Sequence, residues 1–201
     1  MVTDRSSLEI ALEEVGGFEE PSPSLEQYAT PADLASHVLH FAYMQGDIEG
    51  KQVVDLGCGT GVLSVGAALL GGDVLGVDID TAAVGRARQN AATVGVSDLT
   101  DWVNADVGDL CLRLEDVTVV MNPPFGAQRR GADRPFLEKA TEIGDVIYSI
   151  HNEGSRDFVE GFLGDRGEIT HGFAAKLRVP HQFEFHTEES REIDVEAYRI
   201  E

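Results

Sequence analysis

The stretch VTVVMNPPF, residues 117–125, joins an apolar run to a turn that cannot continue it. Its first five residues are rich in β-branched side chains, and the two prolines that follow Asn122 cannot extend a hydrogen-bonded ladder. This pattern predicts a buried parallel strand that ends at Met121. Because ligands of open α/β sheets bind outside the carboxyl ends of the strands, we expect residues 122–125 to belong to a functional site.

These four residues have the chemistry needed to hold a planar NH2 group. Asn122 offers a side-chain amide, Pro123 and Pro124 offer carbonyls, and Phe125 offers an aromatic face that can stack on a substrate ring. A conjugated amine is a poor nucleophile, but Asn122 Oδ1 and the Pro123 carbonyl could hold both its hydrogens and aim its lone pair at an electrophile. We therefore expect all four to be catalytic residues. An ordinary strand followed by a Pro-Pro turn is the alternative, and four residues alone favour it.

A glycine loop follows another predicted strand upstream of this site. The strand 52–56 runs into DLGCGTGV, residues 55–62, where glycines at alternate positions allow a tight turn and close approach to a ligand. Asp55 makes this loop unlike the pyrophosphate cradle of dinucleotide folds. A carboxylate suits a ligand with an ammonium or sulfonium group better than one with two phosphates.

Carboxylates end two more predicted strands. Asp78 follows the strand 74–77, about 20 residues after the glycine loop, where a carboxylate can accept both hydroxyls of a ribose. Asp106 and Val107 follow the strand 100–104 and could meet an adenine amino group and a ring nitrogen. Helix capping explains Asp78 or Asp106 almost as well. Taken together with residues 122–125, however, these patterns predict an adenosine-bearing methyl donor beside a site for a planar amine.

The alternation of strands and helices predicts an α/β fold. The expected helices cover residues 6–15, 32–45, 62–70, 81–94, 133–141 and 157–163, and the further strands cover 145–150, 168–177, 182–186 and 193–200. The last two strands are expected to form an antiparallel hairpin, and Thr30 is expected to cap the second helix. The length of 201 residues predicts one domain, 1–201, with N-terminal helices and a strap over the cofactor in 1–45 and the core in 51–201.

The charge balance is strongly acidic. The chain has 36 acidic and 15 basic residues and a net charge of −21, which normally argues against binding to nucleic acid. The only lysines are Lys51, Lys139 and Lys176. Acidic excess with scarce lysine is typical of a halophilic archaeon, whose cytosolic salt reduces the Debye length to roughly 3 Å or less. The charge therefore does not exclude an RNA substrate.

The sequence contains no run long enough to span a membrane and no secretory leader, so we expect a cytoplasmic protein without membrane contact. Cys58 and Cys111 lack partners at metal-ligand spacing, and the histidine pair His37 and His40 lacks further ligands, so no metal is expected.

A basic loop follows the predicted amine site. Arg129, Arg130 and Arg134 form the densest basic cluster of the chain, and beside a pocket for a base they would be natural phosphate contacts. A solvated loop is the alternative interpretation.

With these residues in view, the sequence resembles the class I S-adenosylmethionine-dependent methyltransferases. More narrowly, it is similar to the archaeal and eukaryotic methyltransferase-like family that makes N6-methyladenosine in small-subunit ribosomal RNA. The resemblance extends from about residue 18 to residue 200, and it is carried by LEQYATP, DLGCGTGVLS, GVDID, ADV, MNPPFG, VIYSIH and the terminal FEFH and IDVEAYRI. The strap LEQYATP and the terminal segments are more specific than the glycine loop, which class I methyltransferases share.

The resemblance implies a Rossmann-like fold with a seven-stranded, mostly parallel sheet, an antiparallel last strand and helices on both faces. It implies S-adenosyl-L-methionine as the cofactor. The residues expected to bind it are Gln27 and Thr30 in the strap, Asp55, Gly57, Thr60 and Val62 around the methionine part, Asp78 at the ribose, and Asp106 and Val107 at the adenine. Members of this family can depend on a small zinc-binding activator protein, so a heterodimer and an exposed apolar sheet edge are also expected.

The leading interpretation is therefore an enzyme that methylates adenine N6 in small-subunit ribosomal RNA, with Phe125, Arg129, Arg130 and Arg134 binding the substrate. Methylation of guanine N2 in RNA or of a protein glutamine is the alternative within enzymes, because similar NPP motifs hold those groups. A non-catalytic ribosome-assembly or RNA-binding factor that kept the pocket is the alternative from another class.

Overall fold

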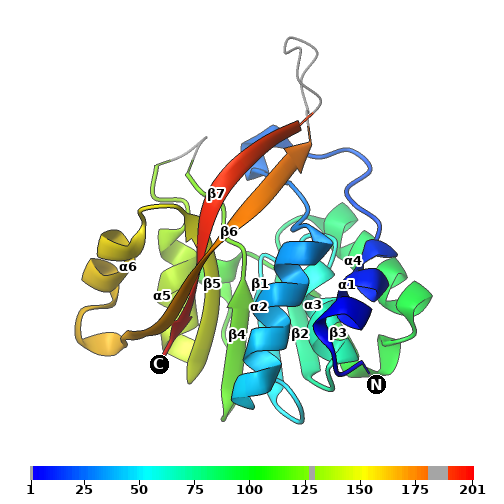
Figure 1. Cartoon of the computed structure of the whole chain (residues 1–201), viewed down its shortest axis with the longest axis horizontal. Coiled ribbons are helices and arrows are strands. Elements are labelled where there is room, and N and C mark those ends of the chain that lie inside the picture. The colour runs from blue at the N-terminus through cyan, green and yellow to red at the C-terminus, as the bar shows by residue number, and fades with distance from the viewer. Residues whose placement is uncertain (1, 127–129, 181–189) are drawn as a thin grey trace.

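The computed structural model describes residues 2–126, 130–180 and 190–201. Its seven strands form one sheet in the order β3-β2-β1-β4-β5-β7-β6 (Figure 1). The strands are β1 (Gln52–Leu56), β2 (Asp73–Asp78), β3 (Thr100–Asn104), β4 (Val117–Met121), β5 (Val146–Asn152), β6 (Ile169–Pro180) and β7 (Ser190–Ile200). The predicted α/β fold with a mostly parallel seven-stranded sheet is therefore confirmed.

Helices connect most of the strands. The α-helices are α1 (Arg5–Glu13), α2 (Ala32–Gln45), α3 (Val62–Leu69), α4 (Thr81–Val94), α5 (Arg134–Ile143) and α6 (Arg156–Leu163). Single 3-10 turns are η1 (Pro23–Leu25), η2 (Ser97–Leu99), η3 (Val107–Asp109) and η4 (Gly164–Arg166). None of the helices in the described ranges is long and apolar enough to cross a bilayer.

The helices cover both faces of the sheet. The helices α1, α2 and α3 pack on one face, together with side chains such as Val53 and Val120, whereas α5 and α6 pack on the other face with Val54 and Val119 (Figure 1). All five residues of β4 are buried, as expected for a central parallel strand that is covered on both sides.

The central strands determine where the site lies. β1 and β4 are parallel neighbours in a register that pairs Leu56 with Met121. The same register pairs Gln52 with Val117 at the other end of the two strands. The glycine loop and the Asn122 turn therefore leave the sheet side by side, although more than 60 residues of sequence separate them. Strand β2 ends beside β1, which brings Asp78 to the same edge.

The C-terminal strands differ from the predicted hairpin. β7 runs antiparallel to both of its neighbours, and it pairs with β6 along its length, from Pro180 opposite Ser190 to Ile169 opposite Ile200. The prediction that residues 182–186 would pair with 193–200 is wrong, because β6 is long enough to occupy that edge of β7. The predicted strand 182–186 itself lies outside the described residues.

Candidate active site

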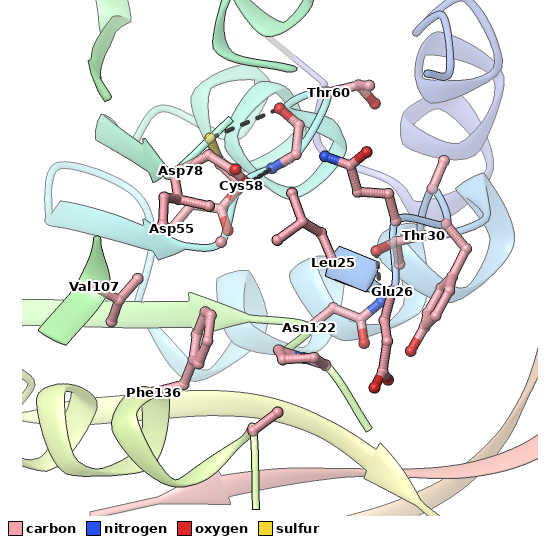
Figure 2. A pocket seen from close by; sticks show the side chains of 18 of the residues that line it. Leu25, Glu26, Thr30, Asp55, Cys58, Thr60, Asp78, Val107, Asn122 and Phe136 are labelled. Carbon is pink, nitrogen blue, oxygen red and sulfur yellow. Dashed lines mark hydrogen bonds between the residues drawn. The ribbon is translucent and has the colours of Figure 1, made fainter. Parts of the chain in front are cut away.

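A cavity of about 360 Å³ lies at the carboxyl ends of β1, β2 and β4, under the N-terminal strap, residues 22–30 (Figure 2). All nine residues expected to bind the cofactor line it: Gln27, Thr30, Asp55, Gly57, Thr60, Val62, Asp78, Asp106 and Val107. Asn122 and Pro124 also line the cavity, whereas Pro123 is buried and Phe125 is half-buried outside this lining.

The glycine loop can take its course only without side chains. Gly57, Gly59 and Gly61 have φ angles of 73°, 53° and 85°, which L residues rarely adopt. A β-carbon on Gly57 would lie 2.8 Å from the ring of Phe136, and one on Gly59 would lie 2.9 Å from the ring of Phe18. The aromatic rings therefore hold the loop backbone against the cavity, and neither ring was predicted from the sequence to belong to the site.

Asp55 presents a buried carboxylate with one open oxygen. The residue is 1% exposed, and its Oδ2 accepts a hydrogen bond of 2.6 Å from the Ser64 hydroxyl on α3. Within the described chain, Oδ1 has no hydrogen-bond partner. Burial raises the pKa of Asp55 to about 7, and the bond from Ser64 opposes that rise. A ligand that brings a cation or a donor to Oδ1 would satisfy this oxygen.

Thr60 also has an open polar atom. The residue is 2% exposed, and its Oγ1 has no hydrogen-bond partner within the described residues. Asn90 on α4 fixes the backbone here by donating to the Thr60 carbonyl at 2.8 Å and to the Gly16 carbonyl at 2.9 Å. Asn90 thus joins the loop to the N-terminal segment. The only signal for it in the sequence is an amide on the buried face of an amphipathic helix.

The strand-end aspartates serve the loops as well as the cavity. Asp78 accepts backbone N–H bonds of 2.8 Å from Gly59 and from Asp80, one on each carboxylate oxygen. Asp106 accepts one of 2.8 Å from Gly108 and caps η3. The capping alternative is therefore correct for Asp106, and Asp78 orders the glycine loop. Each carboxylate oxygen has a second lone pair with which it can still accept from a ligand.

Gln27 anchors the strap. Its Nε2 donates to Asp80 Oδ2 at 2.7 Å, and its Oε1 accepts from the Ser22 N–H at 2.7 Å. The side chain is 8% exposed. Gln27 therefore holds the strap to the loop after β2, in addition to lining the cavity.

Thr30 holds the amide of Asn122. Pro31, not Thr30, is the N-cap of α2, and no side chain caps this helix, so the capping prediction is wrong. The hydroxyl of Thr30 instead accepts a bond of 3.0 Å from Asn122 Nδ2, and Figure 2 shows the two side chains facing each other. Asn122 Oδ1 is buried without a hydrogen-bond partner in the described chain. The contact thus uses the donor end of the amide and leaves its acceptor end for a ligand.

The two described arginines of the predicted basic cluster, Arg130 and Arg134, do not line the cavity. Arg130 is exposed, and Arg134 is the first residue of α5, where its guanidinium lies 5.9 Å from the centre of the Phe158 ring. Arg129 lies outside the described residues. Gly131, Ala132 and Pro135 do line the cavity, so the segment that carries the arginines forms part of its rim.

His151 is not among the residues that line the cavity. His151 on β5 is buried, and its Nε2 lies 2.7 Å from the Ser149 hydroxyl, as expected for a hydrogen-bonded strand-end residue. Over the described ranges, no group of three or more His, Cys, Asp or Glu side chains is placed to hold a metal ion.

A glycine loop after β1, a carboxylate at the end of β2 and one just after β3, and an Asn-Pro-Pro turn after β4 at one edge of this sheet define a class I methyltransferase. Residues 29–143 of the chain match the methyltransferase small domain family. The rRNA N(6)-adenosine-methyltransferases Mettl5 of Drosophila melanogaster and METTL5 of Danio rerio are each 38% identical to the chain over 96% of its length, and the matches cover 94% and 96% of those proteins.

The crystal structure of PH1948 from Pyrococcus horikoshii has a TM-score of 0.90 and 45% identity, and the match covers 100% of this chain and 98% of that chain. The chain belongs to the methyltransferase small domain family, in the branch that contains METTL5. Its cofactor is S-adenosylmethionine, which the open oxygens of Asp55 and Thr60 and the side-chain-free loop fit.

The titration of Asp55 makes the stability of the unliganded protein depend on pH. Its pKa is about 7 in the folded chain and 3.8 for an unburied aspartate. The folded chain therefore keeps a proton that the unfolded chain releases, and stability falls as the pH rises from about 4 to about 7. We expect Asp55→Asn to lack this part of the pH dependence. Urea unfolding of both proteins across pH 4 to 8 measures it.

The control for this experiment is Asp73→Asn, which removes an exposed carboxylate at the start of β2. That variant should keep the slope of the original protein. Parallel stability curves for Asp55→Asn and the original chain would mean that Asp55 ionises normally.

Proposed function

We propose that the chain transfers the methyl group of S-adenosylmethionine to N6 of an adenine in small-subunit ribosomal RNA. The observation that carries this proposal is the buried, open Oδ1 of Asn122, whose amide is oriented by Thr30 at 3.0 Å. An unsatisfied buried acceptor costs about 1–3 kcal/mol, so a ligand N–H that reaches it is favoured. The names of the METTL5 relatives supply adenine N6 of rRNA as the class of substrate.

The cavity residues would hold the cofactor by their position. Asp55, Gly57, Thr60 and Val62 would surround its methionine part, Asp78 would accept from the ribose hydroxyls, and Asp106 with Val107 would meet the adenine. Gln27 and Thr30 would close the strap over it. The bound cofactor supplies an electrophilic methyl group on a sulfonium.

The chain itself would contribute positioning. Asn122 Oδ1 and the Pro123 carbonyl would accept the two N6 hydrogens, and Phe125 would stack on the base. Both acceptors stabilise the positive charge that develops on the nitrogen, and they act in a buried site where such interactions are strong. No side-chain general base is needed for this step.

Arg129, Arg130 and Arg134 would contact phosphates near the target base. Arg134 starts the helix whose next residues, Pro135 and Phe136, line the cavity. The net charge of −21 fits this role in a high-salt cytoplasm, where general repulsion is screened and short-range contacts persist. We infer such a halophilic, cytoplasmic setting and a single methyltransferase domain, 1–201, with the strap region in 1–45.

The test is methyl transfer in high salt to unmodified small-subunit RNA, with labelled cofactor, with and without the activator, followed by nucleoside mass spectrometry. We expect N6-methyladenosine at one site. Label in N2-methylguanosine, or in glutamine of ribosomal proteins, would identify the alternative enzymes. Cofactor binding without transfer to any substrate would favour the non-catalytic factor.

We also propose that the small zinc-binding activator adds to the β3 edge of the sheet. β3 has a neighbour on one side only, so its other side offers backbone donors and acceptors to a partner strand. Val103 on β3 and Leu99 just before it are 36% and 39% exposed, which supplies apolar contact area. The described connection from β3 to β4 contains only the short turn η3 and no α-helix.

Val103→Glu is expected to weaken the complex with the activator at least about tenfold, because a charge at the edge of a sheet opposes strand addition. Val103→Ile keeps the apolar surface and serves as the control. Titration calorimetry with purified activator measures the affinity. If both variants bind as the original chain does, the partner lies elsewhere.

A further inference from the structure

Tyr28 brings the strap into contact with the turn of residues 122–125, which we call the catalytic turn. It lies between η1 and α2 and lines the cavity. Its ring packs against that of Phe125 with centroids 5.6 Å apart and planes tilted by 44°. The strap therefore contributes an aromatic residue to the end of the cavity at which Asn122 lies.

The hydroxyl of Tyr28 is buried, and its proton has no hydrogen-bond acceptor within the described chain. Burial raises the pKa of this phenol, the nearby Glu26 carboxylate raises it further, and the backbone amide of Phe125 opposes the rise. These neighbours place the hydroxyl beside the catalytic turn, and Figure 2 shows Glu26 and Asn122 at the same end of the cavity. The hydroxyl keeps its proton, so it can act as a donor.

Two open polar atoms of opposite kind therefore lie at one end of the cavity. Asn122 Oδ1 can only accept a hydrogen bond, whereas the Tyr28 hydroxyl can donate one. A ligand that presents an amino group next to a ring nitrogen would satisfy both. Adenine has this pair of groups, with N6 beside N7 on one edge and beside N1 on the other. Guanine presents the acceptor O6 where adenine presents N6, so the same pair of atoms would reject the O6 edge of guanine. Its N2 beside N3 is the guanine edge that could still fit, and nucleoside analysis of the methylated product distinguishes it from N6.

We propose that the Tyr28 hydroxyl donates a hydrogen bond to the ring nitrogen adjacent to N6 of the target adenine, and that it selects this base together with Asn122. This role makes Tyr28 a specificity-determining residue, and it rests on the proposed adenine-N6 methyl transfer. A purely structural role of Tyr28, in which its ring packs on Phe125, would be retained by phenylalanine.

The experiment compares kcat/KM for RNA that carries adenosine, 1-deazaadenosine or 7-deazaadenosine at the target position, with the original chain and with Tyr28→Phe. We expect the original chain to lose about 10- to 100-fold on one analogue, as removal of one buried hydrogen bond predicts. On adenosine, Tyr28→Phe should lose a similar factor in kcat/KM. On that analogue, Tyr28→Phe and the original chain should have similar kcat/KM values, because the hydrogen bond is already absent. The analogue identifies the edge that is read.

Tyr43→Phe is the matched control, because Tyr43 lies on α2 outside the cavity lining. It should behave as the original chain, and both variants should bind S-adenosylmethionine normally. A fully active Tyr28→Phe would overturn the proposal. It would also be overturned if, for both analogues, the loss in kcat/KM of Tyr28→Phe on the analogue equalled the product of the two separate losses. Failure of the original chain on natural adenosine RNA would instead overturn the proposed function, and this inference with it.

Discussion

Asn122→Ala is expected to abolish methyl transfer and to leave the affinity for S-adenosylmethionine nearly unchanged. The substitution removes the buried acceptor Oδ1 that would hold the target amine, but no cofactor group is assigned to it. Loss of one positioned hydrogen-bonding group at a reacting centre costs about 100- to 1000-fold in rate. Single-turnover transfer to RNA measures the rate, and calorimetry measures the affinity for the cofactor.

Asn152→Ala is the matched control for this experiment. Asn152 is a half-buried asparagine at the end of β5, and it does not line the cavity. Its replacement should leave the rate within about threefold, because substitutions away from functional contacts have small effects. A fully active Asn122→Ala would mean that the amine is held in some other way.

Asp78→Ala is expected to weaken S-adenosylmethionine binding before it affects the chemical step. The carboxylate would accept from both ribose hydroxyls, and it already accepts from the N–H groups of Gly59 and Asp80 at 2.8 Å. Removing it leaves donors of the loop unsatisfied as well as the ribose. We expect a loss of at least about 2 kcal/mol, or roughly 30-fold in Kd.

Two further variants separate these contributions. Asp78→Asn keeps one acceptor oxygen and should bind more tightly than Asp78→Ala, whereas Asp73→Ala, at the exposed start of the same strand, should bind normally. Calorimetry that gives normal affinity for Asp78→Ala would contradict the ribose assignment.

The sequence predicted those elements that local patterns specify. The bounds predicted for α2, α4, β1, β3 and β4 agree with the structure, because apolar periodicity and Gly, Pro or Asp at the ends determine them locally. The pairing of β7 with β6 was not predicted. Pairing depends on which distant edge is free, and no local pattern encodes that choice. The ion pair of 2.9 Å between Arg199 and Asp47, 152 residues apart, is another contact of this kind.

The residues of the site were easier to predict than their contacts. Strand ends of a parallel sheet converge, so the residues that follow β1, β2 and β4 were expected to meet, and they line one cavity. The bond from Asn122 to Thr30 was missed, because the Thr-Pro pair is typical of a helix start. Phe18, Phe136 and Asn90 were missed because their roles arise only from tertiary packing.

The central claim is that the Asn122 amide holds a flat nitrogen beside the methyl donor. A crystal structure of the chain with an adenosine and a non-reactive analogue of S-adenosylmethionine, bound together as separate molecules, tests it most directly. We predict that N6 lies within hydrogen-bonding distance of Asn122 Oδ1 and of the Pro123 carbonyl, with the cofactor part in the cavity beside Asp55 and Asp78. An adenine bound away from Asn122, or an amide whose oxygen is turned from the cavity, would contradict the claim.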